Sequence, residues 1–291
     1  MADWKSWVQK RPFCVLDGGI GSWLLAEGGV DIPPELFNLR QPEQVKAMHR
    51  AFVQAGARII LTNTFGGNRY RLALAGLADV GREVNQTAVS LARQVASEAE
   101  TLTWVAGSIG PFGGEVSTQT AVSLYAEQAR WLEEAGVDLL WLETMSDLTQ
   151  AETAVQGVRA VSQLPVVLTA SFHQGATITP KALAELARHY QLAATGINCG
   201  EGPHQTPPLI ATLRHELSDL PLVSKPNAGL PQRENGRLIY PLTPTQMAEW
   251  AVRAYTNGAT LIGGCCGATP EHIAAIHTAL TAHVSPGEYA D

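Results

Sequence analysis

Cysteine is scarce in this chain, and long hydrophobic runs are missing. Only four of the 291 residues are cysteine, and no export signal accompanies them, which argues against a fold held together by disulfides. No apolar run approaches the roughly 18 residues that a membrane-spanning helix needs. The N-terminal segment MADWKSWVQKRPF lacks the apolar stretch of a secretory signal. The sequence therefore predicts a cytoplasmic protein with no membrane partner.

Positive charge is also in short supply. The formal net charge is −7, and no basic run interleaved with aromatic residues offers a surface for phosphate backbones, so we expect no nucleic-acid partner. Hydrophobic residues, in contrast, make up 45% of the chain. A chain of this length and composition can bury a full core. These totals indicate a globular protein and leave thiolate chemistry or metal binding open for the cysteines.

Eight short apolar runs recur along the chain, and an amphipathic stretch follows each of them. The runs cover 13–16, 58–63, 103–107, 138–143, 165–171, 194–198, 221–225 and 259–264. Helices are expected over 43–55, 79–99, 118–135, 148–163, 180–191, 205–218, 243–257 and 270–282. This alternation predicts a parallel sheet. Eight units without a linker predict a single (β/α)₈ barrel domain spanning residues 1–291, with a doubly wound open sheet as the alternative.

Local signals mark several of the helix ends. Threonine precedes proline at Thr179, Thr243 and Thr269, a pattern typical of a helix cap followed by a first-turn proline. Glycine lies just before a strand in VQAGAR and EEAGVD, where the end of a helix favours it.

The residues that follow the predicted strands indicate where the chemistry lies. In order they read DGG, TNTFGGN, GSIGP, ETMSD, SFHQG, NCGEG, KPNAG and GGCCG. Enzymes with (β/α)₈ barrels carry their active sites at the carboxyl ends of the strands. Polar, sulfur-bearing and glycine residues crowd these ends, so the sequence predicts the functional site there.

Three of the four cysteines follow predicted strands. Cys199 comes after the sixth, and Cys265 and Cys266 come after the eighth. Three thiolates converging at one end of a barrel would make a zinc site with an open fourth position, and the flanking glycines allow the tight turn that aims two adjacent cysteines at one ion. Burial as small apolar residues and a redox pair at 265–266 are the alternatives. Cys14, inside a predicted strand, is interpreted as a buried apolar residue.

The set of strand-end segments resembles the homocysteine S-methyltransferase family. The similarity runs in order through LDGGIGSWL, TNTFGGN, GSIGPFGGE, LETMSD, GINCG, KPNAGLP and GGCCGATPEHI, from about residue 11 to about residue 280. The pairing of NCG with a later GGCCG is its most specific part. The resemblance implies a zinc-dependent (β/α)₈ barrel that methylates the thiol of homocysteine to give methionine, with Cys199, Cys265 and Cys266 as the zinc ligands. It also implies that Asn227 can supply the fourth ligand when substrate is absent.

The resemblance also implies how the amino-acid end of homocysteine is held. Asp17, with the backbone of Gly18 and Gly19, and Glu143 match the positions at which the family binds it. Physical chemistry agrees, because an ammonium group needs a fixed carboxylate, and a glycine-rich turn before a helix offers N–H groups to a carboxylate. Asn63 is expected to face the pocket mouth, where it orients Asp17 or lines the donor site.

The methyl donor is left open at this point. The candidates are S-methylmethionine, S-adenosylmethionine and methylcobalamin, the last of which implies a separate corrinoid protein. Betaine is least expected, because Thr144 stands where the betaine-using branch typically has an aromatic residue. Four aromatic residues are candidates for cradling a cationic methyl group or for simple packing: Trp23, Phe65, Tyr70 and Phe112. Arg69 and Arg71 are interpreted as a solvated face, with an anion site as the alternative.

Two other functions remain as alternatives to a self-contained methyltransferase. The first is the homocysteine-binding subunit of a divided corrinoid-dependent methionine synthase. The second is a non-catalytic zinc- or thiol-binding barrel.

Overall fold

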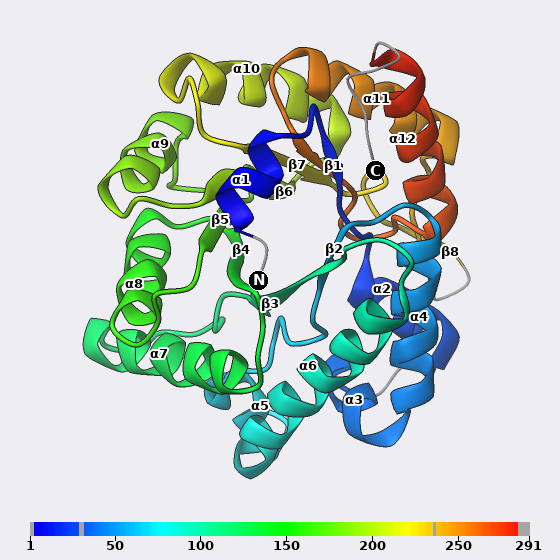
Figure 1. Cartoon of the computed structure of the whole chain (residues 1–291). Helices are drawn as coiled ribbons and strands as arrows, with labels where there is room; N and C mark the ends of the chain where they lie inside the picture. The colour runs from blue at the N-terminus through cyan, green and yellow to red at the C-terminus, as the bar shows by residue number, and fades with distance from the viewer. Residues whose placement is uncertain (1–2, 29–31, 235–236, 285–291) are drawn as a thin grey trace.

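The computed structural model describes residues 3–28, 32–234 and 237–284 of the chain. Eight parallel strands form one sheet in the order β1-β10-β7-β6-β5-β4-β3-β2, and helices surround it (Figure 1). The strands are β1 (Cys14–Val15), β2 (Ile59–Leu61), β3 (Trp104–Ile109), β4 (Leu139–Met145), β5 (Val166–Ala170), β6 (Ala194–Cys199), β7 (Leu222–Pro226) and β10 (Leu261–Ile262). Each lies within or overlaps a predicted apolar run, which confirms the predicted strands.

The two ends of this sheet meet, so the sheet is a barrel and the open-sheet alternative is wrong. A parallel bridge joins Leu16 to Ile59. The amide of Arg58 donates to the carbonyl of Val15 at 2.8 Å, and the amide of Asp17 donates to the carbonyl of Ile59 at 3.2 Å. These bonds tie β1 to β2 and leave no exposed edge between them.

The predicted helices are also confirmed, with ends shifted by a few residues. They are α4 (Pro42–Gln54), α6 (Gly81–Glu98), α7 (Thr118–Glu134), α8 (Leu148–Arg159), α9 (Pro180–His189), α10 (Thr206–Glu216), α11 (Pro244–Thr256) and α12 (Pro270–His283). The prediction missed α1 (Trp4–Gln9), α2 (Ile20–Gly28), α3 (Phe37–Arg40) and α5 (Arg69–Ala73). All four are nine residues or shorter, too short for a clear helical period.

The helix ends follow the local signals in the sequence. Thr179 accepts a hydrogen bond from the amide of Ala182 at 3.2 Å, and Thr243 forms a capping box with Gln246. Gly56 adopts a φ of 108° after α4. A Cβ atom at this position would lie 2.7 Å from the ring of His277, so both the backbone angle and the close packing require glycine.

Helix α1 lies over the amino-terminal end of the barrel (Figure 1). Trp4 and Trp7 are buried and pack against Trp104 of β3, with ring centroids 5.4 and 5.5 Å away. Such aromatic contacts add to the gain from burying apolar area. The amino-terminal end of the barrel is therefore filled by packing, and the opposite end is left for chemistry.

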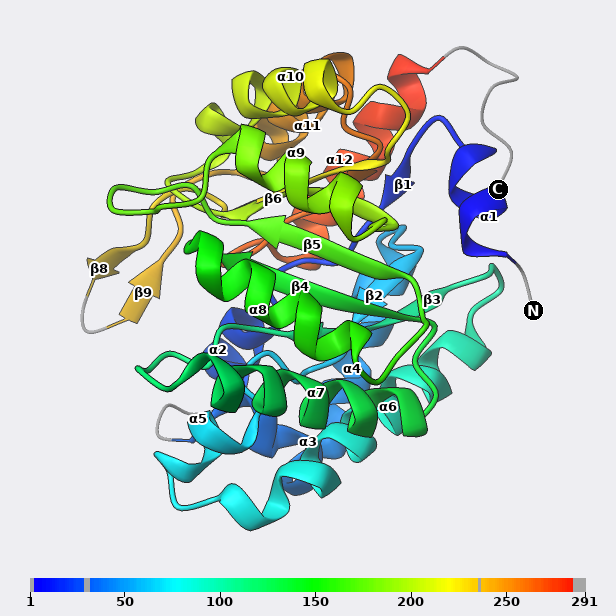
Figure 2. The same cartoon turned by 90° about the vertical axis from the view of Figure 1, so that its left-hand side faces the viewer.

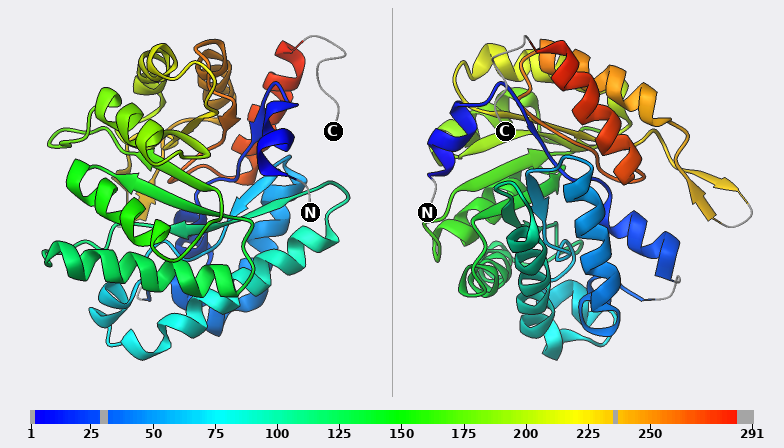
Figure 3. Two further views of the ribbon diagram at one scale, coloured as in Figure 1. Left: turned by 60° about the vertical axis from the view of Figure 1, so that its left-hand side comes forward. Right: turned by 45° about the vertical axis from the view of Figure 1, so that its right-hand side comes forward.

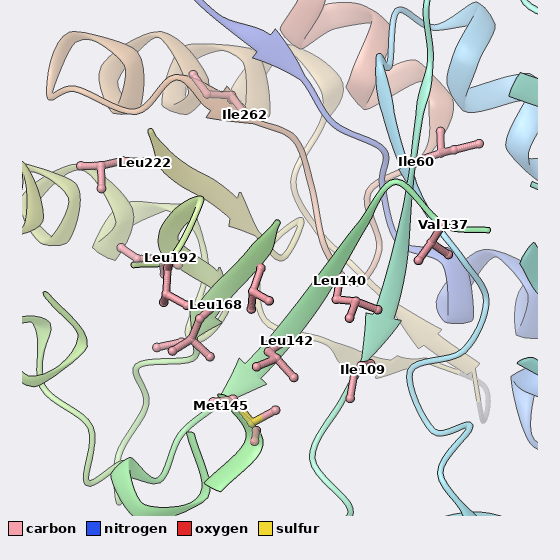
Figure 4. Packing of buried hydrophobic residues seen from close by; sticks show 14 of the residues in the cluster. Ile60, Ile109, Val137, Leu140, Leu142, Met145, Leu168, Leu192, Leu222 and Ile262 are labelled. Atoms are coloured by element: carbon pink, nitrogen blue, oxygen red, sulfur yellow. The ribbon is translucent and has the colours of Figure 1, made fainter. Parts of the chain in front are cut away.

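Side chains alternate between two apolar layers along the strands. In β4, Leu139 and Trp141 belong to the cluster inside the barrel. Leu140 and Leu142 belong to the larger cluster between the sheet and the helices, where Figure 4 shows them with Leu168 of β5. This inside–outside alternation is the one expected of a barrel strand.

A small hairpin projects from the carboxyl end of the barrel, away from α1 (Figures 2 and 3). It consists of β8 (Gln232–Glu234) and β9 (Arg237–Ile239), and it was not predicted. Elsewhere, no helix within the described residues is long and apolar enough to cross a membrane.

His49 of α4 is a buried histidine that makes stability depend on pH. Its side chain is fully buried, and neither ring nitrogen has a hydrogen-bond partner in the described part of the chain. Burial disfavours the charged form and lowers the pKa of His49 from 6.5 to about 4. The unfolded chain therefore binds a proton below pH 6.5 that the folded chain excludes, so stability falls as the pH falls towards 4.

We expect His49 to account for a loss of about 2 kcal/mol in the free energy of unfolding between pH 7.5 and 5. Urea unfolding at both pH values would measure it. His49→Leu should remove this part of the pH dependence, whereas His189→Leu, on α9, should leave it in place. An unchanged pH dependence in His49→Leu would contradict the assignment.

Candidate active site

The carboxyl ends of the strands open into a cavity of about 200 Å³. Its walls include most of the predicted site residues, namely Gly18, Gly19, Asn63, Glu143, Cys199, Cys265 and Cys266. A larger, open groove of about 640 Å³ lies at the other end of the barrel, beside α1, and none of the predicted site residues line it. We therefore place the candidate site in the smaller cavity.

The structure brings the three predicted metal ligands together. The sulfur atoms of Cys199, Cys265 and Cys266 all lie within 4.8 Å of one another, and those of Cys265 and Cys266 are 4.0 Å apart. Tetrahedral zinc with bonds of about 2.3 Å would place its sulfur ligands roughly 3.8 Å apart. All four cysteines are free thiols, and Cys14 is buried away from the group. The spacing of the sulfurs fits a metal ion.

Tight backbone turns aim these sulfurs at one point. Cys199 has a φ of 61° and Gly200 a φ of 74°, so the chain leaves β6 through two left-handed residues. The amide of Cys265 donates to the carbonyl of Pro226 at 2.8 Å. The amide of Cys266 donates to Oδ1 of Asn227 at 3.1 Å. The end of β7 therefore fixes both adjacent cysteines.

The thiols alone are difficult to ionise. They hydrogen-bond to one another and are shielded from solvent, which raises the pKa of Cys199 and of Cys266 to about 12. The pKa of Cys265 is raised as well. A divalent cation supplies the positive charge that lets such thiols bind as thiolates. The donor set therefore fits a thiolate-bound metal.

Asn227 connects the two loops that carry the cysteines. Its Oδ1 accepts from the amide of Cys266, and its Nδ2 donates to the carbonyl of Gly200 at 3.0 Å. Ligation of a metal through Oδ1 would have to replace or share the first of these bonds. Its predicted role as a fourth ligand stays a prediction.

Glu143 is a buried carboxylate on the cavity wall. It is 7% exposed, and the hydroxyl of Ser108 donates to its Oε1. Burial raises the pKa of Glu143, while the nearby Lys225 and the Ser108 hydroxyl act in the opposite direction. A buried carboxylate at the wall is suited to accept hydrogen bonds from a substrate ammonium group.

Asp17 pairs with a lysine next to the cavity. It is fully buried and lies behind the cavity wall, outside the lining. Its Oδ1 lies 2.8 Å from Nζ of Lys225, and its Oδ2 accepts from the amide of Leu61 at 2.7 Å. Asp17 therefore faces the protein's own lysine, and its predicted contact with the substrate stays a prediction.

Lys225 is a site residue that the sequence reasoning missed. It lines the cavity and is only 2% exposed. Burial opposes its charge, but Asp17 and Glu143 keep its pKa above the ordinary value. A lysine at the end of the apolar run PLVSK was the available signal, because a buried lysine requires a carboxylate partner.

The predicted glycine pair packs two loops together at the cavity wall. The amide of Gly19 donates to the carbonyl of Ala268 at 2.9 Å, and a Cβ atom at Gly18 would collide with that carbonyl. The first turn of α2 follows directly, with Ile20 and Ser22 on the cavity wall. First-turn N–H groups lack partners inside a helix, so they can bind an anion.

Asn63 lines the cavity and hydrogen-bonds to residues of the neighbouring loop. Its Nδ2 donates to the carbonyl of Pro34 at 2.7 Å and to Oδ1 of Asn38 at 3.0 Å. Asn63 therefore fixes the loop between α2 and α3.

The two arginines of α5 differ in their surroundings. Arg69 pairs with Glu127 at 2.8 Å on the surface, as a solvated face predicts. Arg71 lines the cavity mouth, and its guanidinium carbon lies 5.3 Å from the ring centroid of Phe65. Arg71 therefore belongs to the site, contrary to its interpretation as part of a solvated face.

Tyr240, just after the hairpin, is a second missed neighbour. Its side chain packs against Gly267, where a Cβ atom would collide with the ring. Burial and the adjacent Cys266 raise its pKa. No motif or spacing in the sequence indicates that this tyrosine lies next to the cysteines.

The chain is similar to known proteins over most of its length. The family described as homocysteine S-methyltransferase matches residues 14–280. Methionine synthase of Mycobacterium leprae is 32% identical over 266 residues, which cover 84% of this chain and 22% of that protein. Methionine synthase of Mycobacterium tuberculosis is 32% identical over 301 residues, which cover 94% of this chain and 25% of that protein. This chain thus spans about a quarter of the length of these two relatives.

Similar structures lead to the same family. The homocysteine methyltransferase MmuM of Escherichia coli in its oxidized form is 25% identical, covers 94% of this chain and 97% of its own, and has a TM-score of 0.78. Its metallated form has a TM-score of 0.81 at 24% identity, covering 94% of this chain and 98% of its own.

Proposed function

The chain belongs to the homocysteine S-methyltransferase family, and on that premise we propose that it binds homocysteine in the cavity and transfers a methyl group to its thiol, giving methionine. One observation carries the proposal: three cysteine sulfurs converge within 4.8 Å in a cavity that Glu143 also lines. The sulfur group suits the thiol end of the substrate, and the glutamate suits its ammonium end. We also propose that residues 1–291 form one homocysteine-binding domain.

Zinc is the metal that we propose for the cysteine group. Zinc favours sulfur ligands in tetrahedral geometry, and the donor set of three thiols fits it. When bound, zinc would lower the pKa of a coordinated thiol, so that a nucleophilic thiolate is present at neutral pH. Cys199, Cys265 and Cys266 would hold the ion. Asn227 would supply the fourth ligand before substrate binds, replacing or sharing the bond that its Oδ1 accepts from the amide of Cys266.

The amino-acid end of homocysteine has matching partners in the same cavity. Glu143 accepts hydrogen bonds from the ammonium group. The start of α2, after Gly18 and Gly19, presents N–H groups to the carboxylate. Asp17 acts behind the wall by holding Lys225 in its charged form, and Asn63 keeps the neighbouring loop in place.

The cavity mouth favours a particular kind of methyl donor. Among the aromatic candidates, Phe65 lines the cavity, and Arg71 already lies over its ring. Phe112 packs against Tyr70 and Tyr125. Among the described residues that line the cavity, Phe65 is the aromatic one, so a small cationic donor would meet a guanidinium beside the ring that could cradle it. We favour a methylated corrinoid brought by another protein or domain over a sulfonium compound.

Methionine formation by the purified, zinc-loaded protein tests both parts of the proposal. Homocysteine would be supplied with S-methylmethionine, S-adenosylmethionine, betaine or methylcobalamin in separate reactions. We expect the highest rate with methylcobalamin. Equal or faster turnover with a sulfonium donor would overturn the donor assignment alone. Failure to bind homocysteine at all, measured by calorimetry, would overturn the proposed function.

A further inference from the structure

The end of β4 departs from regular strand geometry next to the site. Leu142 pairs with Leu168, but the next pair is Met145 with Ala170, so β4 advances three positions while β5 advances two. One extra residue is therefore inserted, which is a β-bulge. Met145 returns to the outer apolar layer that also holds Leu140 and Leu142, as Figure 4 shows along this strand.

The bulge turns two consecutive side chains towards the cavity. In a regular strand, Glu143 and Thr144 would point to opposite faces. Here both of them line the cavity, because Met145 takes the outward place that Thr144 would have had. The inserted residue thus fixes how the end of β4, and with it Glu143, faces the cavity.

In this arrangement Thr144 adopts an unfavourable backbone angle. Its φ is 64°, in the left-handed region that β-branched residues rarely adopt. A backbone in this state persists only where the surroundings hold it, so the bulge needs a partner.

Asn198, the residue before Cys199 on β6, provides that partner. Its Oδ1 accepts from the amide of Thr144 at 2.8 Å, and its Nδ2 donates to the hydroxyl of Thr144 at 2.7 Å. The same Nδ2 lies 3.4 Å from Oε2 of Glu143 and 3.8 Å from Sγ of Cys265. Asn198 is fully buried, so these contacts form without competition from water.

We propose that Asn198 is a positioning residue that clamps the β4 bulge and thereby fixes Glu143 relative to the cysteine group. This inference rests on the proposed function, because it assigns Asn198 an effect on homocysteine binding. One amide side chain connects the carboxylate for the ammonium end of the substrate to the cysteine group for its thiol end. The spacing between Glu143 and the cysteine group therefore depends on it.

Homocysteine affinity in Asn198→Ala and Asn198→Ala/Thr144→Gly tests the clamp. We expect the single variant to bind homocysteine roughly tenfold or more weakly, as loss of buried hydrogen bonds predicts, with zinc content unchanged. Glycine adopts a positive φ freely, so the double variant should keep the bulge without the clamp and recover at least threefold. Calorimetry measures the affinity, and turnover should show the change in KM rather than in kcat.

Two controls separate positioning from general stability. Thr195 lies on β6 like Asn198 but outside the cavity lining, and its hydroxyl donates a buried hydrogen bond of 2.7 Å to the carbonyl of Leu168 on β5. Thr195→Val removes this bond and should leave homocysteine affinity unchanged. Thr144→Gly alone measures the effect of losing the threonine side chain, and the recovery in the double variant is judged against it.

Three outcomes would overturn the inference. They are parental affinity in Asn198→Ala, no recovery in the double variant, and failure of both Asn198 variants to fold while Thr195→Val folds. Failure of the parent protein to bind homocysteine would instead overturn the proposed function, so the two failures are distinguishable.

Discussion

Replacing Cys199, Cys265 or Cys266 with alanine is expected to abolish stoichiometric zinc binding and methionine formation while leaving the barrel folded. The three sulfurs lie within 4.8 Å of one another and form the group that fits a thiolate-bound metal. Each substitution leaves two thiols, which is fewer than the three protein ligands that zinc usually retains in a catalytic site. The side chains lie at the end of β6 and on the loop after β10, outside the main apolar layers, so folding should survive.

Metal analysis after dialysis, circular dichroism and a methionine assay would check this result. Cys14→Ala is the matched control, because Cys14 is buried inside the barrel and is 3% exposed. It should cost some stability but retain one zinc per chain. Retention of one tightly bound zinc in Cys199→Ala would remove Cys199 from the ligand set. A disulfide between Cys265 and Cys266 together with absence of metal in the parent protein would favour the redox alternative.

Substituting Glu143 with glutamine is expected to raise the KM for homocysteine strongly while zinc stays bound. Glutamine keeps the shape and can still accept from Ser108, but it removes the negative charge that we propose binds the substrate ammonium group. A hydrogen bond to a charged group contributes about 1.5–3 kcal/mol, which corresponds to roughly a 10- to 150-fold rise in KM.

Steady-state kinetics with homocysteine as the varied substrate would measure this change. Glu134→Gln is a suitable control, because Glu134 pairs with Arg82 at 2.8 Å on the surface of α7 and should leave KM unchanged. A parental KM in Glu143→Gln would remove Glu143 from the substrate site. A loss of zinc in this variant would show that the carboxylate acts on the metal group instead.

The repeating units and the cysteine set could be predicted from the sequence because their signals are local. Apolar runs and amphipathic stretches follow one another eight times, and Thr243 and Gly56 mark helix ends through their own backbone preferences. The carboxyl ends of parallel strands share one end of a barrel, so Cys199, Cys265 and Cys266 had to approach one another once the fold was known. The short helix α1 escaped prediction because its stability comes from Trp104 on a distant strand.

The fine structure of the candidate site depended on contacts between residues far apart in the chain. Lys225 and Asp17 are separated by 208 positions (225 − 17), and their pairing at 2.8 Å makes Asp17 a partner of lysine rather than part of the cavity wall. The clamp of Asn198 on the Thr144 bulge likewise joins two strands, β4 and β6, that lie on either side of β5, and no spacing in the sequence indicates it.

The sequence by itself therefore determined the eight strand–helix units, the strand ends where the candidate site lies and the resemblance to the family, because each follows from local periodicity or from short strand-end segments. The closure of the sheet into a barrel was shown by the structure. The tertiary structure decided which charged groups face the cavity and which are neutralised behind it. Burial makes the charge state of each group depend on its nearest partner. Those partners are brought together by the closure of the barrel and are distant in the chain.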